Sequence, residues 1–166
     1  MFSVGEFVVH PGQGVCRVAE IDSGTYKLEP VGQRHPMLIS FPAANEDRLR
    51  PVIGADEARS LIDGYPALAI DSYTDRSAAL EEGHFKEVLR QGSCEDAVRV
   101  VKTFRRRIEQ VEREGKHAPV VYERILKAAQ GRSLSEIACA LGTSSDDVVE
   151  LFRASAGEHA GDFTAV

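Results

Sequence analysis

The feature that most constrains the fold is a change in the spacing of apolar residues near residues 51–54. Before this point apolar residues come in short alternating runs, which is the period of a half-buried β-strand. The predicted strands are Phe7–His10, Gly14–Ile21, Thr25–Leu28 and Met37–Phe41. Turn signals rich in glycine and proline separate them, and Pro42 is predicted to end the sheet. We therefore expect several short antiparallel strands in a small curved sheet or barrel.

After Ala55 apolar residues follow the three- and four-residue spacing of amphipathic helices, and no strand pattern returns. The predicted helices are Ala55–Asp63, Asp75–Gln91, Cys94–Glu114, Ala118–Gln130, Ser133–Leu141 and Ser144–Ala154. Gly131 is placed to end one helix, and Ser133 with Glu136 forms a capping-box pattern that would start the next. The predicted fold class is α+β in two segregated parts, an antiparallel β barrel followed by an all-α helical domain. The predicted limits are residues 1–53, residues 54–156 and a flexible tail at 157–166.

Composition argues against several classes of protein. The net charge of −6 argues against binding nucleic acid through bulk charge, so any DNA contact needs a local basic patch. No leader pattern and no apolar run of about 20 residues is visible, so we expect a cytoplasmic protein with no membrane partner. The three cysteines are scattered singly and the five histidines follow no ligand spacing, so we expect no disulfide, metal or cofactor. Because nucleotide-binding and nucleophile motifs are also missing, we do not expect an enzyme.

Three segments of the first 53 residues resemble a known family. They are F-x-V-G-E-F-V-V-H-P-G-Q-G-V-C-R-V at residues 2–18, L-I-S-F-P-A-A-N at 38–45 and L-R-P-V-I at 49–53. These segments are similar to the polymerase-interacting domain shared by CarD/CdnL regulators and transcription-repair coupling factor. The resemblance implies a Tudor-like β barrel that binds the lobe of the RNA polymerase β subunit, partly by strand pairing across the interface. A weaker similarity of residues 95–107, E-D-A-V-R-V-V-K-T-F-R-R-R, to the helical domain of CarD indicates a CarD-type regulator.

The strand Met37–Phe41 is predicted to lie at the edge of the barrel. Prolines at positions 36 and 42 bracket it, and proline is tolerated at sheet margins where no ladder donor is required. An edge strand can accept a strand from another protein, although the apolar content of this one also fits an interior position. Ser40 stands where family members often carry a basic residue, and Arg34 and His35 are placed to supply that charge. The predicted polymerase-binding residues are Arg34, His35, Met37, Leu38, Ile39, Ser40 and Phe41.

Basic residues crowd the helix predicted from Cys94. On a 3.6-residue period Arg99, Lys102 and Arg106 project to one side of its apolar stripe, with Arg105 at an edge. Such a patch can neutralise phosphates without reading bases. The predicted phosphate-contacting residues are Arg99, Lys102, Arg105 and Arg106. The alternative is a solvated helix face whose cations pair with neighbouring glutamates. Because the family resemblance implies DNA contact in this domain, promoter DNA is the second predicted partner. It would be bound without sequence specificity, through phosphates or the minor groove, and close to the sigma factor.

CarD and CdnL proteins typically insert a tryptophan from the start of the helical domain into the minor groove, but this sequence contains no tryptophan. Counting forward through S-Y-T-D-R, Tyr73 takes that place; counting back from Gly92 without a gap, the position falls near Ala78. A tyrosine ring can fill the space between unstacked bases, whereas an alanine cannot. Tyr73 and Arg76 complete the predicted DNA-binding set.

Residues 132–152, R-S-L-S-E-I-A-C-A-L-G-T-S-S-D-D-V-V-E-L-F, have the spacing of a helix-turn-helix. Gly142 occupies the turn, and Val148 faces inward from the second helix. That helix carries Asp146, Asp147 and Glu150, whose carboxylates would repel phosphate. We interpret this unit as structural packing or a protein-contact surface.

Together with these patterns, the family resemblance implies a transcription regulator that anchors to RNA polymerase and modulates the stability of the open promoter complex. Two alternatives remain open. One is a protein-interaction module without DNA contact, and the other is a helix-turn-helix repressor.

Overall fold

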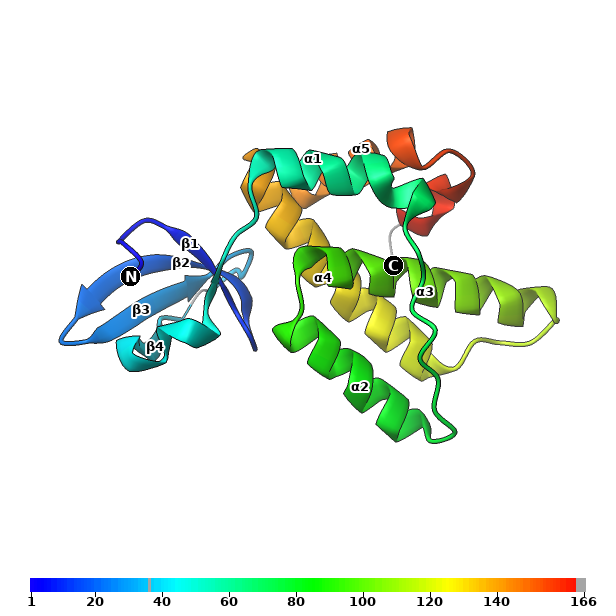
Figure 1. Cartoon of the computed structure of the whole chain (residues 1–166), viewed down its shortest axis with the longest axis horizontal. Coiled ribbons are helices and arrows are strands. Elements are labelled where there is room, and N and C mark those ends of the chain that lie inside the picture. The colour runs from blue at the N-terminus through cyan, green and yellow to red at the C-terminus, as the bar shows by residue number, and fades with distance from the viewer. Residues whose placement is uncertain (36, 164–166) are drawn as a thin grey trace.

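The computed structural model describes residues 1–35 and 37–163, which form two parts in chain order (Figure 1). We call residues 1–53 the β module and residues 54–163 the helical module. Every described strand lies in the β module, and every described α-helix lies in the helical module. The α+β class with segregated parts, predicted from the change in apolar spacing, is therefore confirmed.

The β module is a five-stranded antiparallel sheet in the order β4-β3-β2-β1-β5. Its strands are β1 (Phe7–His10), β2 (Gly14–Asp22), β3 (Thr25–Pro30), β4 (Ile39–Pro42) and β5 (Arg50–Pro51). Gly14, with a φ of +76°, and Gly24, with a φ of +75°, allow the left-handed backbone that the two tight hairpins need. An irregularity in the β2–β3 register between Val18 and Glu20 is the kind of bulge that bends a sheet. The core of this module consists of Val8, Cys16, Val18, Tyr26, Leu28, Phe41 and Leu49.

The course of the chain after β4 differs from the prediction. Pro42 does not end the sheet, because it pairs with Thr25 as the last residue of β4. A 3-10 helix, η1 (Ala43–Arg48), then leads the chain across to β5, which pairs with β1. A two-residue strand after a short helix leaves no periodic signal, since two residues are too few to show alternation.

The helical module is built around its two longest helices, α3 and α4, which pack on each other. Its elements are α1 (Ala55–Gly64), the 3-10 helix η2 (Tyr65–Ala67), α2 (Ala78–Gln91), α3 (Cys94–Arg113), α4 (Val120–Leu141), α5 (Ser145–Ala156) and the 3-10 helix η3 (Gly157–Phe163). Ser93 and Asp96 form the capping box that starts α3. The aromatic core includes Phe85, Phe104 and Phe152, all fully buried. Within the described part of the chain, the helices lack the combination of length and apolar character that a bilayer span requires.

Two predicted helices are one continuous helix, α4. Gly131 lies inside it, and the Ser133 hydroxyl donates to the Ala129 carbonyl at 2.8 Å instead of capping a new helix. Glu136 bonds to the β module, so the predicted capping box is wrong. The helix ends at Gly142, whose φ of +66° confirms it as the turn glycine.

The flexible tail predicted at 157–166 is wrong for residues 157–163. These residues form η3, in which Asp162 and Phe163 are 3% and 2% exposed. The Phe163 ring stacks on Phe152 with 4.1 Å between ring centres and lies edge-on to Tyr65. The buried Phe163 ring and the Asp162 carboxylate, which bonds to Tyr65 and Arg106, hold this otherwise small and polar segment in place. Residues 164–166 lie outside the described residues.

Buried polar contacts join the two modules. Arg50 of β5 donates two hydrogen bonds to the Glu136 carboxylate of α4, at 2.5 and 2.8 Å. One turn earlier on α4, Arg132 donates across the joint to the Pro11 carbonyl, and within the helical module to the Leu89 carbonyl at 2.9 Å. The Glu136 side chain is 4% exposed, so its charge depends on Arg50 for compensation. The orientation of the β module on the helices is therefore held by directional bonds on both sides of the joint.

Candidate interaction surfaces

The β4 strand lies at one edge of the sheet, as predicted. It pairs with β3, from Leu28 opposite Ile39 to Thr25 opposite Pro42, and no other described strand lies beside it. The helical module meets the sheet elsewhere, through the β1–β2 turn and β5. Just before β4, Met37 is 77% exposed and Leu38 is 56% exposed. An open strand edge next to exposed apolar side chains is suited to pairing with a strand of another protein.

The residues predicted to bind polymerase do not all face solvent. The exposed members are Arg34, His35, Met37, Leu38 and Ser40. Phe41 is 7% exposed and Ile39 packs partly against the same core, so the interior alternative holds for these two side chains. The Ser40 hydroxyl accepts a hydrogen bond from the Lys27 ammonium at 2.7 Å, which brings a cation beside the strand. The proline at position 36, predicted to bracket this strand, lies outside the described residues.

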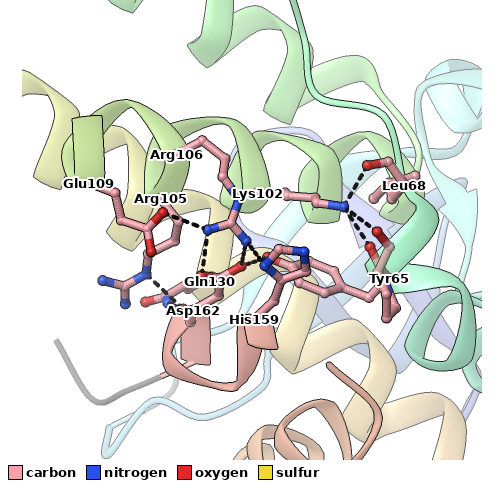
Figure 2. A network of polar contacts seen from close by, with 10 residues as sticks. Tyr65, Leu68, Lys102, Arg105, Arg106, Glu109, Gln130, His159 and Asp162 are labelled. Carbon is pink, nitrogen blue, oxygen red and sulfur yellow. Dashed lines mark hydrogen bonds and ion pairs between the residues drawn. The ribbon is translucent and has the colours of Figure 1, made fainter. Parts of the chain in front are cut away.

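Lys102 lies inside the helical module, between α3 and η2 (Figure 2). It is 6% exposed, and its ammonium donates to the carbonyls of Tyr65, Pro66 and Leu68 at 2.9, 2.9 and 2.8 Å. Burial, followed by the charge of Arg106, lowers the pKa of Lys102. The side chain therefore fastens η2 to α3, and the prediction that it faces phosphate is wrong.

Arg105 and Arg106 are bound by η3. The Arg106 guanidinium donates to the Asp162 carboxylate at 2.8 Å and to Glu109 at 2.8 Å, while Arg105 Nε donates to the Asp162 carbonyl at 2.7 Å. The same carboxylate accepts a hydrogen bond of 2.5 Å from the buried Tyr65 hydroxyl. Burial and this bond raise the pKa of Tyr65. Figure 2 shows these groups converging on Asp162, so the C-terminal segment occupies this face of α3.

Two further cations of α3, Arg99 and Arg107, are also paired within the chain. Arg99, whose side chain is 30% exposed, bonds to Glu95 and Asp96 at 2.8 and 3.1 Å. Arg107 bonds to Glu81 at 2.8 Å. The structure therefore does not gather the predicted phosphate contacts into one solvent-facing patch. It favours the alternative of intramolecular ion pairs, with η3, α2 and the first turn of α3 supplying most of the acids.

Tyr73 lies in the connection between η2 and α2 and is half-buried. Its ring stacks on His84 with 3.7 Å between centres and 16° between planes. Ala78, the other position at which the family tryptophan falls, is the first residue of α2. Arg76 is exposed, and Leu80 in the first turn of α2 is 62% exposed. Sequence reasoning missed Leu80, because one leucine in a helical pattern normally indicates a core position.

Sequence reasoning also missed a group of exposed cations where α2 packs beside α4. We call Lys86, Arg124 and Lys127 the α2–α4 basic face. The side chains of Lys86 and Arg124 are 72% and 61% exposed. Lys86 lies 3.3 Å from one Glu82 oxygen, and Arg124 donates to both Glu82 oxygens at 3.2 and 3.0 Å. Both cations lower the pKa of Glu82, Arg124 most strongly. All three cations line a groove of about 590 Å³ together with apolar side chains of both helices.

The segment with helix-turn-helix spacing packs as predicted through its inward side. Val148 of α5 is fully buried, while Asp146, Asp147 and Glu150 are exposed. A helix that offers carboxylates on its open face is unsuited to base reading. Among the described residues, histidine, cysteine and acidic side chains form no group that could hold a metal ion.

Comparison with known proteins gives one finding that bears on these surfaces. The family model described as CarD-like/TRCF RID domain matches residues 2–53. The match spans the whole β module with the β4 edge and ends before α1, so the helical module lies outside it. No curated protein matches the chain.

Proposed function

We propose that the CarD-like/TRCF RID domain of residues 2–53 docks this protein on RNA polymerase, and that the protein regulates transcription by binding rather than by catalysis. The observation that carries the proposal is the family match across a module whose β4 edge is open. The partner inferred from the resemblance is the β subunit. A strand of that subunit would add to β4, with main-chain hydrogen bonds giving affinity and neighbouring side chains giving specificity.

The exposed side chains beside β4 give this contact a testable form. Met37 and Leu38 offer apolar surface, and Lys27 on the neighbouring strand supplies a cation close to Ser40. Burying apolar side chains at the centre of an interface contributes most of its affinity, whereas a carboxylate placed there is left unpaired. Leu38→Glu should therefore weaken polymerase binding while leaving the fold intact, since the side chain already faces solvent.

Capture of RNA polymerase on immobilised protein tests the docking step. The wild-type protein should retain the β subunit, and Leu38→Glu should reduce retention by about tenfold or more. Val4→Glu is a matched control, because Val4 is 58% exposed and precedes β1, which β2 and β3 separate from β4 in the sheet. Failure of the wild-type protein to retain polymerase, or equal effects of the two substitutions, would contradict the proposal.

We further propose that the helical module contacts promoter DNA through the α2–α4 basic face, and not through α3 as predicted from sequence. Lys86 and Arg124 stay largely exposed although both pair with Glu82, so they can still neutralise phosphates and release counterions. Lys102 and Arg106 of α3 are instead covered by η2 and η3. At the start of α2, Arg76 and the exposed Leu80 add a cation and an apolar side chain of the kind that wedges between base steps. Docking on polymerase raises the local concentration of this weak surface at the promoter, which explains how an acidic chain can act on DNA.

The lifetime of the open promoter complex tests this second step. Replacing Lys86, Arg124 and Lys127 together by Glu should return the open-complex lifetime toward the value measured without the protein. The slope of DNA affinity against salt concentration should also become shallower, by the equivalent of about three phosphate contacts. Arg113 and Lys116 are exposed cations outside this face, so their replacement by Glu serves as the control. Unchanged lifetimes with polymerase binding intact would favour a second candidate. That candidate is a protein-interaction module without DNA contact, which the acidic open face of α5 supports.

A further inference from the structure

A pocket of about 290 Å³ lies where the two modules meet. The β module contributes β1, the turn after it, η1 and β5, and the helical module contributes the end of α2. Three arginines from three different elements line it: Arg48 of η1, Arg50 of β5 and Arg90 of α2. Asp47 is the carboxylate among the lining residues. The lining therefore carries a net positive charge, although the chain as a whole has a net charge of −6.

Two of the three arginines are placed to receive a ligand. Arg48 is exposed and makes no hydrogen bond or ion pair within the described part of the chain. Arg90 is 48% exposed and bonds to Glu87, which also accepts a hydrogen bond from Gln91. Both guanidinium groups can therefore turn toward an anion without breaking a buried contact. Arg50, in contrast, is held by the Glu136 carboxylate and forms a fixed wall.

The surroundings of the pocket are positively charged. Arg132 donates to the carbonyl of Pro11, which lines the pocket, and to the carbonyl of Leu89. The pKa of His10, the last residue of β1, is lowered by burial first, and then by Arg132 and Arg48. Burial and the charge of Arg50 likewise lower the pKa of Arg132, and the Glu136 carboxylate offsets part of this shift. Cations that depress one another's protonation attract an anion placed between them.

We infer that this pocket is a phosphate-binding site that joins the two modules through its occupant. The planar guanidinium group matches the oxygens of a phosphate bidentately, and the volume accommodates a phosphate or a diphosphate. An occupant held by Arg48 and Arg90 contacts the β module and the helical module at once. The phosphate group comes from a free phosphorylated small molecule or from a DNA backbone. The inference does not rest on the proposed function, because binding is measured without polymerase.

Titration of the full chain with inorganic pyrophosphate, followed by calorimetry, tests the site. Arg48→Ala and Arg90→Ala should each weaken binding by about tenfold, because each removes charge-assisted hydrogen bonds. Asp47→Asn should strengthen it, because a like charge is removed from the pocket. Arg113→Ala removes an exposed arginine of α3 that does not line the pocket, so it should have no effect. Circular dichroism checks that each variant keeps the fold, which is expected since all four side chains are exposed.

The results divide clearly. Pyrophosphate binding that depends on Arg48 and Arg90 but not on Arg113 supports the site. Competition between pyrophosphate and a short DNA duplex then identifies the backbone as the source of the phosphate, and lack of competition identifies a free ligand. Absence of pyrophosphate binding, or equal loss in the Arg113→Ala variant, would overturn the inference.

Discussion

Replacement of Lys102 by methionine separates a structural role from a role in DNA binding. Methionine has nearly the same length and fills the same space, but it cannot donate to the carbonyls of Tyr65, Pro66 and Leu68. A buried acceptor without a donor costs about 1 kcal/mol or more, so losing three bonds should cost about 3 kcal/mol. This cost is large compared with most single substitutions and would remove a substantial part of the stability of a small domain.

Urea unfolding of the full chain measures this effect. Arg99→Met is the matched control on the same helix, because Arg99 is 30% exposed and its ion pairs lie on the surface. Exposed pairs of this kind contribute about 0.5 kcal/mol, so the control should unfold close to the wild-type midpoint. If Lys102→Met were as stable as the control and bound DNA more weakly with a shallower salt dependence, the ammonium would contact phosphate and the structural assignment would be refuted.

Three further outcomes are expected. Glu136→Gln should destabilise the chain by about 2 kcal/mol in thermal unfolding, because the partly exposed Arg50 guanidinium loses charge-assisted hydrogen bonds to the buried carboxylate. The lowered pKa of His10 means that the unfolded chain takes up a proton first, so stability should fall as pH drops below the ordinary value of 6.5. His10→Asn should flatten that fall, and a wild-type slope retained in this variant would count against the assignment. Gly142→Ala should cost about 1 kcal/mol in urea unfolding, because its φ is +66°.

The β module was predictable because its signals are local. Alternating apolar residues define a strand, and glycines that need a positive φ define the hairpins, so neither depends on distant contacts. β5 escaped prediction because two residues carry no period. The fusion of two predicted helices into α4 has a similar origin, since Gly131 and Ser133 are weak terminators whose cost tertiary packing overrides.

The site was harder to predict because charge alone does not determine exposure. Lys102 belongs to a run of cations that looks solvated in the sequence, yet it is buried by η2, which lies more than thirty residues earlier. Arg106 is bound by Asp162, 56 residues later, so no local pattern could show its partner. The α2–α4 basic face also depends on which helices pack side by side. The β4 edge was found because prolines mark sheet margins.

The braced joint between the modules has a mechanical consequence. Because Arg50 and Arg132 fix the β module against α4, the two modules should move as one rigid body. A rigid body loses little conformational freedom when its helical end binds a target, unlike two domains on a flexible linker. Its reach is equally inflexible, so a small rotation where the sheet is anchored would displace the helical end by a much larger arc.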